Sequence, residues 1–123
     1  MKKAKTAEQV VRDIIARDKR YDVGAYQFVL EALDYTYRMI GRRKHVSGKQ
    51  LLEGVRRYAV ISYGIMARSV LEHWGMYRCE DIGEVVFNLV DHGLLSKTER
   101  DSRSDFKGGY NFREAFDGLF EDN

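Results

Sequence analysis

The sequence contains no proline in its 123 residues, so the residue that most effectively breaks a helix is absent. Apolar residues recur at helical spacing over five segments, about 7–17, 23–40, 47–63, 65–74 and 81–92. Glycines follow or interrupt most of these segments, at positions where a helix can end or bend. The pattern predicts a mainly α protein of about five helices.

Polar residues at the segment boundaries indicate where helices begin. Thr6 is followed by Gln9 and Ser47 by Gln50, which is the spacing of a capping box. Asp22 is a suitable N-cap for the second helix, and Gly41 can take the left-handed conformation that ends it. The apolar spacing also assigns Ser62 of the third helix and Ile65 of the fourth to the buried side.

The C-terminal region allows two interpretations. Residues 96–109 are polar and predict a loop of about a dozen residues. Tyr110-Asn111-Phe112 can pair as a short strand with residues 94–97, giving a small C-terminal β-hairpin and a winged-helix-like fold. Alternatively, Asn111 and Glu114 cap a last helix that continues through Phe116, Leu119 and Phe120.

Size and cysteine usage restrict the class of protein. The length fits one compact helical domain over 1–123, in which the basic tail 1–5 is expected to be disordered. Cys79 is the only cysteine, so an intramolecular disulfide is impossible and a cytoplasmic location is favoured. The basic N-terminus is not followed by an apolar stretch, and no segment is long enough to span a membrane, so we expect neither a secretory signal nor membrane insertion.

The charge is unevenly distributed along the chain. Residues 1–60 hold 14 Lys/Arg and 7 Asp/Glu, whereas residues 61–123 hold 7 and 12. The basic loop 42–45 is the best candidate for contact with nucleic acid. The loop consists of Arg42, Arg43, Lys44 and His45. Further basic residues can extend it: Lys2, Lys3, Lys5, Arg56 and Arg57. Three tyrosines can supply surfaces on which bases stack: Tyr35, Tyr37 and Tyr58. The non-core side of the fifth helix is mainly acidic, which argues against that helix reading DNA.

Catalytic and metal-binding patterns are weak. Cys79 precedes the fifth helix and His73 is six residues upstream, but a nucleophilic pair requires contact that spacing alone does not establish. His45, His73 and His92 lack metal-ligand spacing, and the acidic group Glu99, Asp101 and Asp105 lacks the spacing of a calcium loop. Phosphate-binding glycine motifs are also absent, so we expect no cofactor or metal.

The chain has eight tyrosines, several of them beside arginine. Tyrosine and arginine are enriched in protein interfaces, although a tyrosine at the margin of a core is equally common. Together with the absence of a catalytic pattern, this density favours a small non-enzymatic interaction or regulatory protein. It would bind another protein or self-associate through a Tyr/Arg-rich surface and the 96–109 loop. Nucleic-acid binding through the 42–45 loop is the alternative.

Four segments together resemble a known group of proteins. They are residues 25–33 (AYQFVLEAL), 45–54 (HVSGKQLLEG), 81–90 (DIGEVVFNLV) and the tail 105–116. The combination resembles a family of conserved uncharacterised bacterial proteins known mainly from Planctomycetes and Verrucomicrobia. The resemblance spans nearly the whole chain and implies a bacterial origin. It implies no activity and no catalytic residues.

Overall fold

The structure, a computed structural model, describes residues 4–41, 45–96 and 103–118. Within these residues lie five α-helices: α1 (Ala7–Arg17), α2 (Val23–Ile40), α3 (Gly48–Tyr63), α4 (Ala67–His73) and α5 (Cys79–Asp91). Three short helical turns complete the secondary structure: η1 (Gly64–Met66), η2 (Arg103–Phe106) and η3 (Arg113–Asp117). The prediction of a mainly α protein with about five helices is confirmed.

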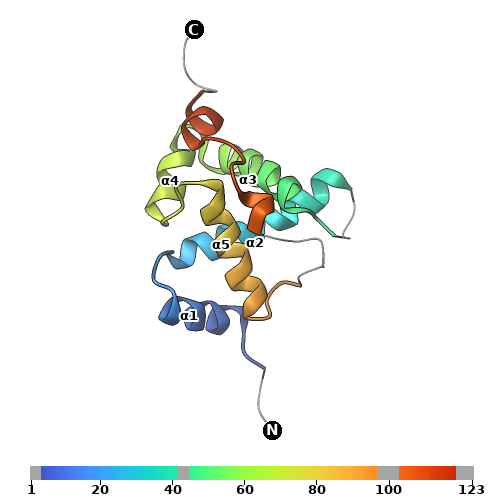
Figure 1. Cartoon of the computed structure of the whole chain (residues 1–123), viewed down its shortest axis with the longest axis vertical. Helices are drawn as coiled ribbons and strands as arrows, with labels where there is room; N and C mark the ends of the chain where they lie inside the picture. Colours follow the sequence, from blue (N-terminus) through green and yellow to red (C-terminus); the bar gives the residue numbers. More distant parts are fainter. Residues whose placement is uncertain (1–3, 42–44, 97–102, 119–123) are drawn as a thin grey trace.

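The helices are arranged around the α2–α3 pair, and α5 packs against α1, α2 and α3. Figure 1 shows α1 at the end of the molecule nearest the N-terminus, with α4 and η3 at the opposite end. Buried side chains from all five helices and from η2 and η3 form a single core cluster. The described residues therefore share one hydrophobic core.

The predicted starts of α1, α2 and α3 and the predicted end of α2 are confirmed by hydrogen bonds at the caps, whereas α5 begins at Cys79 rather than near residue 81. Thr6 and Ser47 each accept the backbone N–H of the glutamine three residues later, and that glutamine side chain accepts the cap residue's own N–H. Asp22 accepts the N–H of Gly24 at 2.9 Å. Gly41 ends α2 with a positive φ of 74°. These contacts satisfy backbone groups that a helix end leaves unpaired.

The closest approach within the core lies between α2 and α3. Thr36 of α2 is fully buried, and its hydroxyl donates to the carbonyl of Ala32 at 2.7 Å. A Cβ atom added to Gly54 of α3 would lie only 1.7 Å from the Thr36 hydroxyl oxygen. The missing side chain of Gly54 is therefore what allows the two helices to come together here.

The predicted C-terminal β-hairpin is wrong. No strand occurs in the described residues, and the chain after Asn111 enters η3. Asn111 accepts the N–H of Glu114 at 3.1 Å, as the alternative interpretation predicted for a helix start. The Tyr110 hydroxyl donates to the carbonyl of Leu52 at 2.8 Å, which fixes this segment against α3. Lys97 of the proposed hairpin, and Leu119 and Phe120 of the alternative helix, lie outside the described residues.

The chain is interrupted at Gly64 as predicted, but the fourth helix begins at Ala67 rather than near residue 65. Gly64 has a positive φ of 55° and separates α3 from η1, so the helical phase does not continue from one to the other. Ser62 near the end of α3 and Ile65 in η1 are exposed rather than buried as predicted, with Ile65 68% exposed. The predicted loop 96–109 also differs from the structure, because residues 103–106 form η2 and bury Phe106.

Candidate functional site

The residues predicted to bind nucleic acid do not form a field of unpaired positive charge where the structure describes them. Arg56 and Arg57 both donate to Glu53, at 3.0 Å and 2.9 Å, and the Arg56 hydrogen bond lowers the pKa of the Glu53 carboxyl. Tyr58 donates its hydroxyl to Glu31 at 2.9 Å, and its ring lies 5.6 Å from the ring of Phe28.

The remaining members of the basic group are only partly described. Lys5 forms an ion pair with Asp13. Lys2, Lys3, Arg42, Arg43 and Lys44 lie outside the described residues, and His45 lies at the edge of a cavity. Binding of nucleic acid by the 42–45 loop stays a prediction.

Seven of the eight tyrosines are buried or half-buried, and only Tyr77 is exposed, at 58%. Tyr58 and Tyr63 contact the ring of Phe28, and Tyr63 also lies edge-on to Trp74. This aromatic cluster explains much of the tyrosine content by packing, so tyrosine density gives little support to a contact surface.

Cys79 begins α5 and is almost completely buried. Both hydrogen-bonding contacts of its thiol are with the backbone of Tyr110, whose N–H lies 3.3 Å from the sulfur. Burial raises the pKa of the thiol and disfavours the reactive thiolate. His73 is exposed and His92 bonds to the Asn88 carbonyl, so neither is hydrogen-bonded to Cys79.

The acidic group considered for a metal is incompletely described. Glu99 and Asp101 lie outside the described residues, whereas Asp105 is half-buried in η2. In residues 4–41, 45–96 and 103–118, no three His, Cys, Asp or Glu side chains are grouped so as to hold a metal ion.

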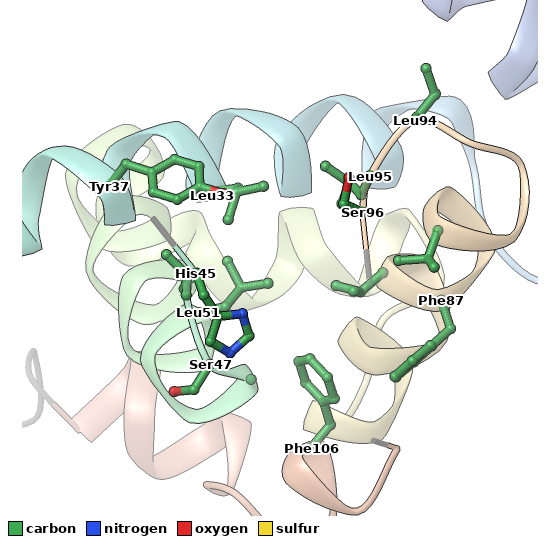
Figure 2. A pocket seen from close by; sticks show the side chains of 14 residues that line it. Leu33, Tyr37, His45, Ser47, Leu51, Phe87, Leu94, Leu95, Ser96 and Phe106 are labelled. Atoms are coloured by element: carbon green, nitrogen blue, oxygen red, sulfur yellow. The ribbon is translucent and has the colours of Figure 1, made fainter. Parts of the chain in front are cut away.

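A cavity of about 460 Å³ lies between α2, α3, α5 and η2. Figure 2 shows Leu33 and Tyr37 on one side, Phe87 on another, and Phe106 closing one end. Its fourteen lining residues are mostly apolar: Leu33, Tyr37, His45, Val46, Ser47, Gly48, Leu51, Val86, Phe87, Val90, Leu94, Leu95, Ser96 and Phe106. The sequence indicated several of these as core residues, but nothing in their spacing predicted that they would surround an open space.

The Phe106 ring packs against two helices at glycines, where the lack of a side chain leaves room for it. A Cβ added to Gly83 of α5 would lie 2.7 Å from the Phe106 ring, and one added to Gly48 of α3 would lie 3.1 Å from it. The Phe106 and Phe87 rings lie edge to face at 6.2 Å, and the Arg103 guanidinium lies over Phe87. The only large apolar residue in an otherwise polar segment was the available sequence signal for this contact.

A second feature is an exposed apolar surface where α3 turns into η1. We call Ile61, Ile65 and Met66 the corner surface; they are 67%, 68% and 55% exposed. Only five large apolar side chains are exposed in the described part of the chain, and the three of the corner surface all lie between residues 61 and 66. Sequence reasoning missed this surface because it assigned Ile65 to the core.

Comparison of the chain with protein-family models found no match, and comparisons with curated proteins and with solved structures found none either. The resemblance to an uncharacterised bacterial family therefore stays a prediction. Of the helices in the described residues, none combines the length and the hydrophobicity needed to cross a membrane. The cavity and the corner surface are therefore the two candidate binding sites in the described residues.

Proposed function

We propose that the protein is a small, non-enzymatic interaction protein that uses the corner surface to bind a second copy of itself. The observation that supports this is the concentration of exposed apolar side chains at Ile61, Ile65 and Met66. Clustered apolar exposure is unusual on a monomer surface and marks contact sites more often than scattered single residues do.

The size of the corner surface indicates the strength of the association. Fully burying an Ile or Met side chain contributes roughly 1.5–3 kcal/mol, and these three are already partly covered. A stable interface usually buries about 1,200–2,000 Å² in total, of which three side chains would form only the centre. We therefore expect a weak dimer whose population rises with protein concentration.

The charges beside the corner surface favour a second copy as the partner. Arg57, four residues before Ile61, is paired with Glu53. Arg68, three residues after Ile65, is paired with Asp117 and Glu72. A two-fold dimer brings the same surface of each copy together, so an unpaired charge would repel its own copy. Because both arginines have partners within the chain, two copies can approach without that repulsion.

Sedimentation velocity over a series of protein concentrations tests the proposal. We expect the average sedimentation coefficient of the wild type to rise with concentration. The double variant Ile61→Glu/Ile65→Glu is expected to stay monomeric, because each copy would then carry two carboxylates into the contact.

Tyr77→Glu is the matched control, since Tyr77 is similarly exposed but lies on the link between α4 and α5. It should associate like the wild type, and circular dichroism should show that all three proteins are folded. A wild type that is monomeric at every concentration contradicts the proposal. So does a double variant that associates as strongly as the wild type.

A further inference from the structure

The cavity between α2, α3, α5 and η2 differs from the rest of the described core because none of the side chains that the structure describes fills it. Its volume of about 460 Å³ is within the range of about 300–1,000 Å³ that is typical of small-molecule sites. Hydrophobic and aromatic side chains form most of the lining, with a few polar groups among them, as in such sites generally. We propose that it binds an uncharged, mostly apolar small molecule.

The lining determines the charge of the molecule. None of the fourteen described residues around the cavity is Asp, Glu, Lys or Arg. A buried charge without a partner is very costly, so an ionised group on the ligand would lose hydration and gain no ion pair from these walls. The described walls therefore favour a ligand with a neutral body.

A few polar groups can orient the ligand. The lining includes the hydroxyls of Tyr37 and Ser96, neither of which makes a hydrogen bond within the described part of the chain. Figure 2 shows the imidazole of His45 directed into the space between Leu51 and Phe106. The Ser47 hydroxyl is already used at the start of α3, where it accepts the N–H of Gln50. A ligand hydroxyl or carbonyl can pair with the hydroxyls of Tyr37 and Ser96 while its apolar body contacts the helices.

The neighbouring chain is poorly suited to fill the space itself. Residues 42–44, which precede His45 in the sequence, are Arg-Arg-Lys, and residues 97–102, which follow Ser96, are Lys-Thr-Glu-Arg-Asp-Ser. These side chains carry charges or hydroxyls that are costly to bury against Leu, Val and Phe. An added helix, about 10–12 Å across with its side chains, is also too bulky a partner for a cavity of this size. A small apolar molecule from solution matches the described walls better than either of these polar segments does.

Fluorescence of N-phenyl-1-naphthylamine, a neutral apolar dye, tests the site directly. We expect saturable enhancement with the wild-type chain, displacement by 1-decanol, and little displacement by decanoate at neutral pH. Val86→Phe, which adds bulk to the α5 wall, should weaken dye binding about tenfold or more, a loss of about 1.4 kcal/mol or more. Val60→Phe is the matched control, because Val60 is also half-buried in a helix but does not line the cavity.

Three outcomes would overturn the proposal, and the double variant of the corner surface tests where the dye binds. If the folded wild type gives no saturable signal, if decanoate displaces the dye as well as decanol does, or if both valine variants bind equally, the proposed neutral site is wrong. The double variant Ile61→Glu/Ile65→Glu should keep full dye affinity. A loss in that variant would place the dye on the corner surface instead, and would leave the self-association proposal standing or failing on its own sedimentation test.

Discussion

Helix α2 has two sides that differ in how closely they are packed. Toward α3, Thr36 and Gly54 approach so closely that a single added carbon would overlap the threonine hydroxyl. Toward α5, Leu33 and Tyr37 border a cavity of about 460 Å³. Protein interiors are normally packed as densely as organic crystals, and an open space loses contact energy for the atoms that line it. The difference means that, among the described residues, an added side chain meets atoms already in place on the α3 side of α2 but finds space on the α5 side.

Adding a side chain at Gly54, where α2 and α3 meet, should lower the stability of the protein more than any other change considered below. Gly54→Ala places a Cβ about 1.7 Å from the Thr36 hydroxyl oxygen, and the buried threonine has no room to move away. We expect the free energy of unfolding to fall by about 3 kcal/mol or more, measured by urea denaturation.

Two controls sharpen this result. Gly118→Ala adds a Cβ that meets no other atom, so it should leave stability nearly unchanged. Combining Gly54→Ala with Thr36→Ala removes the nearest atom and should recover part of the loss. If Gly54→Ala alone were as stable as the wild type, the closely packed contact would not exist.

Replacing valine by phenylalanine should lower stability at a filled core position and raise it at the wall of the cavity. Val29→Phe enlarges a fully buried side chain of α2 and is expected to cost about 1–3 kcal/mol of stability. Val86→Phe extends into the cavity and is expected to add about 0.5–2 kcal/mol. Thermal and urea unfolding of both variants measure the contrast. Equal destabilisation by the two changes would mean that the cavity is not open in solution.

The smallest effect concerns the hydrogen bond that joins Asn88 of α5 to Asp18, the residue after α1. The Arg20 side chain lowers the pKa of Asp18, and the Asn88 amide donates to the same carboxylate at 3.0 Å. Because the folded-state pKa lies below the usual value of about 3.9, the stabilisation is present above that value and is lost as the pH falls below it.

Asp18→Asn should therefore flatten the decline in stability between about pH 4 and more acidic conditions. At neutral pH it should cost about 1 kcal/mol, since the Arg20 side chain is 56% exposed and water screens the ion pair. Urea denaturation at several pH values gives this slope. A variant with the same acid slope as the wild type would show that Asp18 does not contribute to it.

The features that could be predicted from the sequence are those determined by neighbouring residues. The capping pairs Thr6–Gln9 and Ser47–Gln50 placed two helix starts correctly, since each involves atoms only three residues apart. The docking of Phe106 could not be predicted, because it depends on glycines 23 and 58 positions away that meet only in the folded chain. The corner surface was missed because Ile65 was assigned to the buried side of the fourth helix, whereas it lies in η1, before that helix begins at Ala67.

Neither candidate site was visible in the composition. The cavity is lined by residues such as Leu51 and Val86, whose spacing is equally typical of a filled core. Whether such residues touch or leave a space depends on the distance between helices, which tertiary packing determines. By contrast, the basic residues Arg56 and Arg57 were conspicuous in the sequence but share the carboxylate of Glu53 in the structure.

The burial of Cys79 also makes the chain convenient for labelling studies. It is the only thiol, it is covered by the segment at Tyr110, and its raised pKa slows alkylation. A cysteine introduced at an exposed position such as Tyr77 would therefore react first, without removal of the native thiol. The slow rate at which Cys79 itself is modified would then measure how often the segment at Tyr110 separates from the start of α5.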